Sequence, residues 1–405
     1  DSGWSPVLAA SGETIAFSVE PASDLEKRCA AAQESLDLEN GPLVRLVLFQ
    51  NSGEPSRLLL VMHHLIVDAV SWRIILGELG TACLQLQSGR PVCLPMPTTS
   101  YARWAASLSA LAHSPQIRMH LAAFRSISST KVAPLPRDFE GSRNLEGSAV
   151  RITVSLAPEK TRILTTDLPR TWHVPIHDAL IAALAQALGG WTGNSLQLMD
   201  IEGHGREDLD SEVDLTRTVG WFTTICPVLI DIGAPCKPID RLVRIHEQLS
   251  GLPGWPRRTL AFGLLRYLAY TDCQQVMAAL PRPEVIFNFM GQSRQGPSAG
   301  SLWHPATQSS GPSRSPRQPR SHLIELNAEI IDGALSAEFT YAADCHMPAT
   351  IASLAARFHA VLEALAVECR HAPRAYHPSD FPETGLSQAE LDQALAELGI
   401  AQERE

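Results

Sequence analysis

The chain has 405 residues, a length that predicts two or three compact units rather than one small domain. Hydrophobic residues make up 45% of it and charged residues 19%, which excludes a disordered or fibrous chain. The 33 Lys and Arg residues against 43 Asp and Glu give a formal net charge of −10, so broad electrostatic binding to nucleic acid or to an anionic membrane is not expected.

The sequence contains no uncharged apolar run of about 18 residues, and residues 1–4 lack the basic and apolar blocks of a signal peptide. We therefore expect a soluble, cytoplasmic protein. Its eight cysteines form no C-x-x-C pair, so the pattern predicts neither a zinc cluster nor a disulfide framework. Reduced, mostly structural thiols and no bound metal are expected.

The first part of the chain predicts two paired strands followed by two helices, because apolar runs give way to helical spacing after Asp68. In chain order these are strands over 43–49 and 58–67 and helices over 70–86 and 101–111. Prolines at 134 and 136 then interrupt the pattern. We therefore predict an N-terminal domain, 1–140, and a C-terminal domain, 141–405.

The second part predicts strands and helices that end in a hairpin and a long helix. In chain order these are a strand over 150–156, a helix from Pro158, a buried helix over 176–188 ending at Gly189-Gly190, strands over 196–202, 285–289, 323–330 and 334–341, and a helix over 351–367. Asp332-Gly333 is typical of a hairpin turn. The stretch 293–320 is rich in Ser, Pro, Gly and Arg, and we expect a long mobile loop there.

Two histidines and an aspartate lie at the end of the apolar run over 58–67. Because side chains alternate along a strand, His63 and His64 are expected on opposite faces, which leaves one of them for a structural role. A histidine at the end of a buried strand can act as a base near neutral pH, but a buried, hydrogen-bonded pair explains the same pattern. Asp68 is expected to cap the following helix or to fix the turn through a salt bridge.

A second polar cluster, 200–207, follows a predicted strand. Asp200 and Glu202 share one face of that strand, with Glu202 at its end, and the glycines that follow allow a sharp turn. A solvated charged turn is the alternative interpretation. A phosphate loop is not indicated, because no P-loop Lys-Ser/Thr and no full G-x-G-x-x-G follow.

Five segments together carry a family resemblance. They are HHLIVDAVSW at 63–72, EGHGRE at 202–207, TVGWFTTICP at 218–227, FNFMGQ at 287–292 and PSDF at 378–381. In this order they resemble motifs of the condensation-like superfamily of nonribosomal peptide synthetases, and specifically of its epimerization domains. Amide-forming condensation domains usually have Gly where this chain has Ala69.

Two departures from the family pattern bear on the predicted lobes and site. The family begins with a segment bearing a PIQxWF-like motif, which has no counterpart here, so the N-terminal lobe is expected to be truncated. Phe289 stands where the family usually has Tyr, so a hydroxyl is not available at that position.

The resemblance implies an α/β fold of two chloramphenicol-acetyltransferase-like lobes in a V arrangement, with the active site between them. It implies an isomerase that converts L to D at Cα of an aminoacyl or peptidyl thioester. The substrate would be carried on the 4'-phosphopantetheine arm of a carrier protein, and neighbouring synthetase domains would be further partners. The resemblance implies neither a metal nor a cofactor of the domain's own.

His64 and Glu202 are the implied catalytic residues, one on each side of the substrate, because an enolate-like intermediate needs a base and an acid on opposite faces. The remaining implied site residues either support the site or bind substrate. The supporting residues are His63, Asp68, Trp72 and Arg206, and the substrate-binding residues are Asn288 and Phe289.

Three other interpretations stay open. An amide-forming acyltransferase would use His64 on an acceptor amine, but EGHGRE and Ala69 argue against it. The absent initial motif leaves room for a non-catalytic module that docks carrier proteins. An unrelated hydrolase is disfavoured, because the sequence has no G-x-S-x-G elbow.

Overall fold

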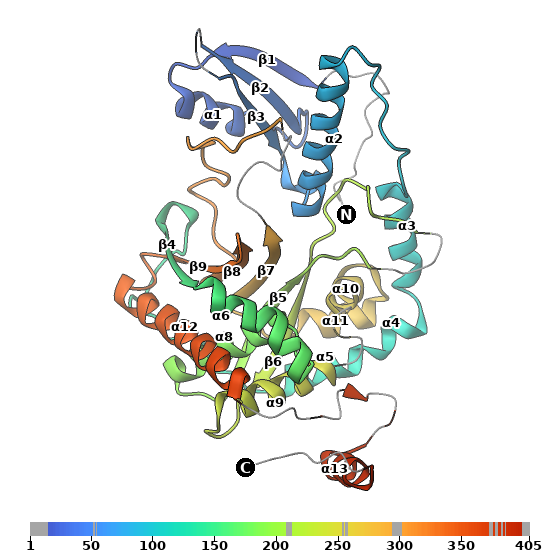
Figure 1. Cartoon of the computed structure of the whole chain (residues 1–405), viewed down its shortest axis with the longest axis vertical. Coiled ribbons are helices and arrows are strands. Elements are labelled where there is room, and N and C mark those ends of the chain that lie inside the picture. Colours follow the sequence, from blue (N-terminus) through green and yellow to red (C-terminus); the bar gives the residue numbers. More distant parts are fainter. Residues whose placement is uncertain are drawn as a thin grey trace. The chain divides into compact units, whose positions relative to one another are not determined.

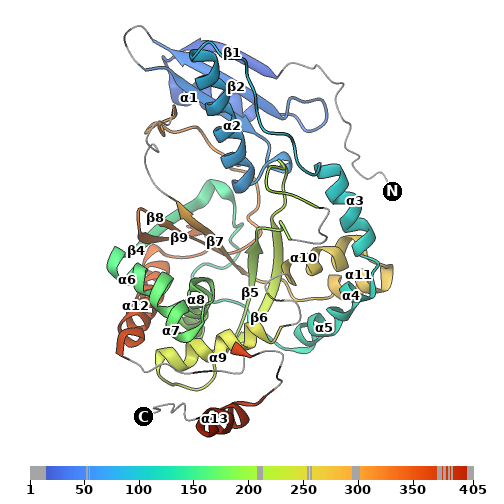
Figure 2. The same ribbon diagram turned by 45° about the vertical axis from the view of Figure 1, so that its right-hand side comes forward.

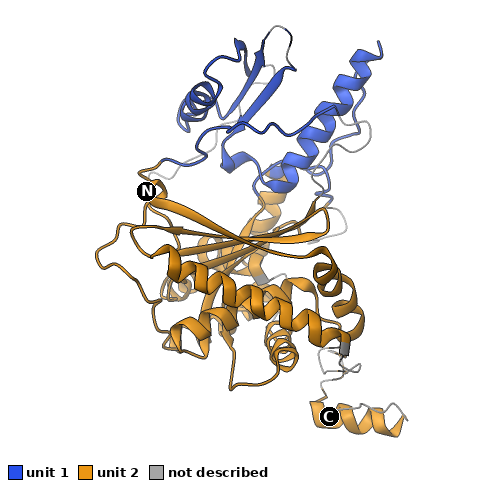
Figure 3. Cartoon of the chain, turned by 60° about the vertical axis from the view of Figure 1, so that its left-hand side comes forward, with its two compact units in different colours: residues 1–101, 214–221, 296–315 blue, residues 102–213, 222–295, 316–405 orange. Residues whose placement is uncertain are grey.

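The structure is a computed structural model, and it divides the chain into two compact units (Figure 3). It describes residues 15–51, 53, 55–207, 213–252, 255, 258–293, 302–371, 376, 380, 381, 384 and 386–398. Unit 1 comprises residues 1–101, 214–221 and 296–315, and unit 2 comprises residues 102–213, 222–295 and 316–405. The first boundary therefore falls after Tyr101 rather than at 140, because apolar side chains between 112 and 127 are buried in a core of unit 2.

Unit 1 contains a three-stranded sheet in the order β1-β2-β3 (Figure 1). Its elements are β1 (Ala16–Pro21), α1 (Leu25–Glu34), β2 (Val44–Gln50), β3 (Arg57–Met62), the short 3-10 helix η1 (His64–Ile66) and α2 (Ala69–Gln87). β1 is parallel to β2, β3 is antiparallel to β2, and α1 packs on one face through Cys29 and Ala32. The predicted strand pair and helix are confirmed, but the second strand ends at Met62, before both histidines.

Unit 2 is built on a six-stranded mixed sheet in the order β4-β9-β8-β7-β5-β6. The strands are β4 (Ala149–Leu156), β5 (Leu196–Gly203), β6 (Thr224–Asp231), β7 (Val285–Ser293), β8 (Ile324–Ile331) and β9 (Ala334–Ala342). β7 runs parallel to both of its neighbours, and the other pairs are antiparallel. The predicted hairpin turn is confirmed, with φ of 48° at Asp332 and 85° at Gly333. With one sheet in each unit, the predicted α/β class is also confirmed.

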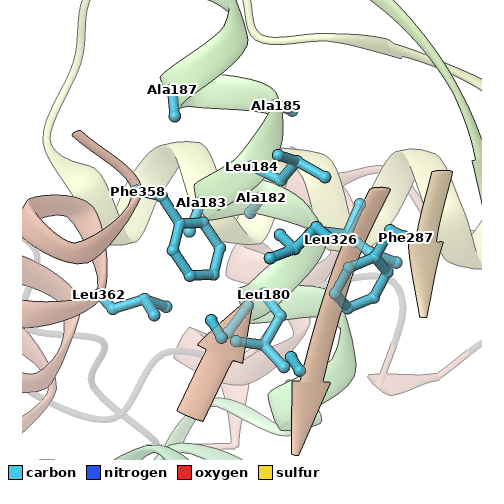
Figure 4. Close-up of a cluster of buried hydrophobic side chains, with 14 of the residues drawn as sticks. Leu180, Ala182, Ala183, Leu184, Ala185, Ala187, Phe287, Leu326, Phe358 and Leu362 are labelled. Atoms are coloured by element: carbon cyan, nitrogen blue, oxygen red, sulfur yellow. The ribbon is translucent and has the colours of Figure 1, made fainter. Parts of the chain in front are cut away.

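Helices of unit 2 cover both faces of this sheet (Figures 1 and 2). In chain order, the helices from Tyr101 onward are α3 (Tyr101–Leu111), α4 (Pro115–Met119), α5 (Leu121–Ser129), η2 (Glu146–Ser148), α6 (Pro158–Arg162), η3 (Ile163–Asp167), α7 (Leu168–Trp172), α8 (Ile176–Thr192), α9 (Pro238–Ser250), α10 (Arg258–Gly263), η4 (Leu264–Leu268), α11 (Thr271–Ala278), α12 (Pro348–His371) and α13 (Gln388–Glu397). Figure 4 shows Leu180 and Leu184 of α8 with Phe287, Leu326 and Phe358 in the larger core. A second core, which includes Leu198 and Cys226, lies between α5, α10 and α11 and the other face of β5 and β6.

Helix α8 ends later in the sequence than predicted. The helix continues past Gly189-Gly190 and ends before Gly193, whose φ of 72° is typical of a residue that follows a helix. A Cβ built on Gly189 would lie 2.3 Å from Cδ1 of Ile232. Gly189 therefore permits close packing within the helix instead of ending it.

Among the described residues, α12 is the one helix long and apolar enough to cross a membrane by length and composition. Its side chain Leu354 is buried in the larger core, as are Phe358 and Leu362 (Figure 4). Packing in the core therefore accounts for its apolar composition.

The segment 302–320 contains no helix or strand, as expected, but it is anchored within each unit. In unit 1 the indole of Trp303 lies close to α2. In unit 2 the buried guanidinium of Arg320 lies 3.1 Å from Glu325. These contacts anchor the two ends of the segment, its mobility stays a prediction, and 294–301 lie outside the described residues.

Two of the four residues of the predicted closing motif at 378–381, Asp380 and Phe381, are among the residues that the structure describes. Nδ1 of His173 donates to Oδ1 of Asp380 (2.7 Å), and Phe381 lies against the ring of Tyr376. Pro378 and Ser379 of the motif lie outside the described residues.

A buried carboxylate joins α8 to α9 in unit 2. Nδ1 of His246 donates to Oδ2 of Asp178 (2.7 Å), and Nδ1 of His177 lies 3.2 Å from Oδ1. Burial alone would raise the pKa of Asp178, but these hydrogen bonds outweigh burial and hold the pKa below its usual range. The ionised form of Asp178 is therefore favoured by folding.

We expect Asp178→Asn to lower the free energy of unfolding at pH 7 by about 1–3 kcal/mol, since it removes a buried charge-assisted hydrogen bond. A lowered native pKa stabilises the fold above the unfolded-state value of about 4 and ceases to do so as the pH falls below it. Urea unfolding should therefore show a difference from wild type that persists from pH 7 to 5 and shrinks below about pH 4. Asp37→Asn is the control, because Asp37 also has a lowered pKa but is fully exposed. A difference that persisted undiminished to about pH 2 would contradict this account.

Candidate active site

The two histidines of unit 1 lie in the turn that follows β3. His63 precedes η1, and its Nδ1 accepts a hydrogen bond from the backbone N–H of Leu65 (3.2 Å). His64 is the first residue of η1, and it is exposed. The alternation argument for these residues is wrong, because the strand has already ended, but the turn still gives the two side chains different surroundings.

Asp68 is buried and caps α2. Its Oδ1 accepts a hydrogen bond from the backbone N–H of Ser71 (2.7 Å), which confirms the predicted N-cap. The backbone N–H of Trp72 bonds to the carbonyl of Asp68 in the first turn of the helix, and its side chain is half-buried. Asp68 and Trp72 thus lie at the start of the helix that follows the histidine turn, and their supporting role stays a prediction.

The loop 214–221, which comes from the chain between β5 and β6, belongs to unit 1 and packs beside α2. The hydroxyl of Ser71 accepts a hydrogen bond from the N–H of Gly220 and donates one to its carbonyl, both at 3.0 Å. At the other end of the loop, Arg217 lies 2.5 Å from Glu78. This loop carries Trp221, whose indole lies against the imidazole of His64 with ring centroids 4.9 Å apart.

Glu202 lies in unit 2, near the end of β5, where it is half-buried. The chain turns sharply after it, since Gly205 has a φ of 65° and a Cβ there would lie 1.7 Å from the carbonyl oxygen of Phe222. The guanidinium of Arg206 stacks over the Phe222 ring at 4.0 Å, and its backbone N–H donates to Nδ1 of His204 (3.0 Å). Arg206 therefore packs on Phe222 in the turn that follows Glu202, and its role as a supporting residue stays a prediction.

A buried pair adjoins Glu202 on its own face of the sheet. Nε2 of His322 donates to Oδ2 of Asp200 at 2.8 Å, and both residues are buried. Asp200 and Glu202 are two residues apart on β5 and so point to one face. The sequence argument missed His322, although a histidine directly before a predicted strand was a usable signal.

Asn288 and Phe289 lie on opposite faces of β7. Ile201 of β5 is in register with Phe287, and both are buried in the larger core. By alternation, Glu202 and Asn288 share the other face, whereas the Phe289 ring packs against the core. The structure therefore brings Asn288 to the face of Glu202 but not the ring of Phe289.

The described residues contain no group of three or more His, Cys, Asp or Glu side chains that could hold a metal ion. All eight cysteines are described and free. The chemistry that the site residues can supply is proton transfer, by an exposed imidazole in unit 1 and a half-buried carboxylate in unit 2. That these two groups act on one substrate stays a prediction.

A family model described as Condensation domain matches residues 13–380 of this chain. The chain therefore belongs to the condensation-domain family, and its two-sheet α/β fold is that of the family.

Two curated relatives match almost the whole chain. A linear gramicidin synthase of Brevibacillus parabrevis is 37% identical over 410 residues, which cover 98% of this chain and 8% of the relative. Chondramide synthase of Chondromyces crocatus is 36% identical over 405 residues, which cover 97% of this chain and 10% of the relative. The chain thus spans a small part of the length of these relatives.

Solved structures give a similar result. The epimerization domain from the third module of tyrocidine synthetase B is 29% identical, with a TM-score of 0.81 over 89% of this chain and 82% of that chain. The condensation domain from the Monacolin K polyketide synthase is 17% identical, with a TM-score of 0.63 over 87% of this chain and 79% of that chain. The second likeness is one of fold alone.

Proposed function

We propose that this chain is an epimerization domain of a cytoplasmic nonribosomal peptide synthetase. It inverts Cα from L to D in an aminoacyl or peptidyl thioester that is carried on the 4'-phosphopantetheine arm of a carrier protein. The carrier protein and the neighbouring synthetase domains are its partners. The observation that carries this proposal is Glu202, a half-buried carboxylate at the end of β5 that the EGHGRE turn holds in place. The likeness to the epimerization domain from tyrocidine synthetase B supports the same assignment.

The reaction needs two proton-transfer groups. The thioester carbonyl makes the Cα hydrogen removable as a proton, and the electron pair of the broken C–H bond passes into an enolate. Return of a proton to the opposite face of Cα inverts the centre. His64 and Glu202 are the proposed pair, one acting as base and the other as acid, with their roles exchanged in the reverse direction.

The developing enolate oxygen also needs hydrogen-bond donors. The side-chain amide of Asn288 is the proposed donor, because alternation puts it on the face of Glu202. Trp72, Asp68 and His63 support the turn that presents His64, and Arg206 supports the turn after Glu202. No step requires a metal or a cofactor of the domain's own.

Solvent deuterium provides the test of this proposal. The full-length parent protein, with an L-aminoacyl group loaded on its carrier, is incubated in D₂O, and the released amino acid is analysed for chirality and for deuterium at Cα. Epimerization must replace the Cα hydrogen with deuterium as the D enantiomer forms, because the removed proton equilibrates with water.

An amide-forming condensation enzyme is the second candidate, favoured by the family description and by the shared histidine motif. Such an enzyme would form an amide without Cα exchange. A parent protein that binds the loaded carrier but does neither would instead favour the docking module. Either result would overturn the epimerase assignment.

A further inference from the structure

The imidazole of His64 is held in a different way from that of its neighbour. The ring of His63 is fixed by the backbone N–H of Leu65. No hydrogen bond to the His64 ring is found among the described residues, and this exposed ring instead lies against the indole of Trp221, tilted by 45° at a centroid distance of 4.9 Å. An exposed side chain samples several rotamers, so this contact is what restricts His64.

We propose that Trp221 is a positioning residue for His64, which keeps the imidazole oriented for proton transfer. This inference rests on the proposed function in taking His64 as a proton-transfer group. The face of an indole attracts an imidazole ring whether the ring is neutral or protonated, through ring stacking in one case and a cation–π interaction in the other. Such a support suits a group that must both lose and gain a proton.

Trp221 is itself firmly held. The phenol of Tyr101 donates to the backbone carbonyl of Trp221 (2.9 Å). Burial, together with the nearby carboxylate of Asp68, raises the pKa of Tyr101, so that its hydroxyl remains a donor. A Cβ on Gly220 would lie 2.2 Å from Cδ2 of Tyr101, so the loop passes close beneath that ring. The indole therefore extends from a fixed backbone.

The same loop is fixed to the helix that begins beside His64. The hydroxyl of Ser71, in the first turn of α2, bonds to both backbone groups of Gly220. Thr218 donates through its hydroxyl to the carbonyl of Thr99 (2.6 Å). Ser71 of α2 thus holds the loop that carries Trp221 beside the turn that carries His64, and 39% of the surface of Trp221 stays exposed.

The test compares Trp221→Leu and Trp221→Phe with Trp191→Leu in the full-length parent protein. Trp191 is a matched control, since its indole also lies against a histidine ring, that of His346, at 5.6 Å in unit 2. Because a misplacement of about 1 Å can cost about 10²-fold in rate, Trp221→Leu should lower the first-order rate of Cα exchange on the tethered substrate about 10- to 100-fold. Trp221→Phe should keep most of the activity, and Trp191→Leu should keep all of it.

A merely structural role would not reproduce two further signatures. Trp221→Leu should impair Cα exchange from the same enantiomer as His64→Ala does, and it should cause no further loss in a His64→Ala background. Equal impairment of both enantiomers, or losses that multiply in the double variant, would overturn the proposal.

A measurement on the 405-residue chain separates this proposal from the proposed function. The NMR signal of the His64 ring, assigned by its absence in His64→Gln, should shift in Trp221→Leu and stay unchanged in Trp191→Leu. If the wild type proves to form amides, Trp221→Leu must depress that reaction instead, and the epimerase assignment alone fails. If the wild type does neither reaction, a His64 signal that is unmoved by Trp221→Leu overturns the positioning role, and a shifted signal upholds the contact.

Discussion

His64→Ala and Glu202→Gln are each expected to lower the rate of Cα inversion by about 10²- to 10⁴-fold, the usual cost of losing a positioned acid or base. Glu202→Gln keeps the size of the side chain and removes only the carboxylate. The rates are measured as formation of the D enantiomer from the L-aminoacyl carrier in the full-length parent protein. His63→Ala, in the same turn, should act mainly through folding, because its ring nitrogen bonds to the backbone of Leu65.

The two catalytic variants should also differ from each other. If one group is the base for the L substrate and the other for the D substrate, each variant loses deuterium exchange from one enantiomer and can keep it from the other. Inversion that survives at the wild-type rate in either variant would remove that residue from the mechanism. Exchange lost from both enantiomers in both variants would argue against separate bases.

Gly205→Ala is expected to abolish most of the activity and to lower the midpoint of urea unfolding. Gly205 has a φ of 65°, a left-handed conformation that costs an L residue about 1–2 kcal/mol. In addition, its Cβ would lie 1.7 Å from the carbonyl oxygen of Phe222, so the backbone must move. The turn after Glu202 would shift with it.

Gly333→Ala is the matched control for this change. Gly333 also has a positive φ, 85°, but a Cβ there meets nothing within 4 Å. The control should therefore show only the conformational cost and should keep its activity. Equal losses of stability and activity in both variants would mean that the contact with Phe222 does not matter.

Local patterns predicted the strands and the helix cap well, because these depend on residues close in sequence. The apolar run before His63 gives β3, Asp68 caps α2, and Asp332-Gly333 makes the β8–β9 turn. Where packing between distant residues decides, the predictions were wrong. Gly189 stays helical because Ile232 packs against it.

The candidate site shows the same contrast between features set by local sequence and features set by contacts between distant residues. The motifs identified Glu202 and His64, but neither alternation nor spacing could place the indole of Trp221 on the imidazole of His64, because 157 residues of chain separate them. The pairing of Asp200 with His322 likewise joins residues 122 positions apart. The Phe289 ring was assigned to the substrate from its motif, whereas the pleat of β7 directs it to the core.

The composition of unit 1 has a consequence for how this protein is made. Two segments of unit 1, the loop 214–221 and residues 302–315, lie more than 100 residues after Tyr101 in the sequence. At a synthesis rate of about 5–20 residues per second, roughly 10 to 40 s pass between the emergence of Tyr101 and that of Ser315. During this interval the nascent α2 lacks the loop that binds Ser71 and the indole that lies against His64. The N-terminal quarter of the chain therefore completes its contacts within unit 1 only after most of unit 2 has been translated.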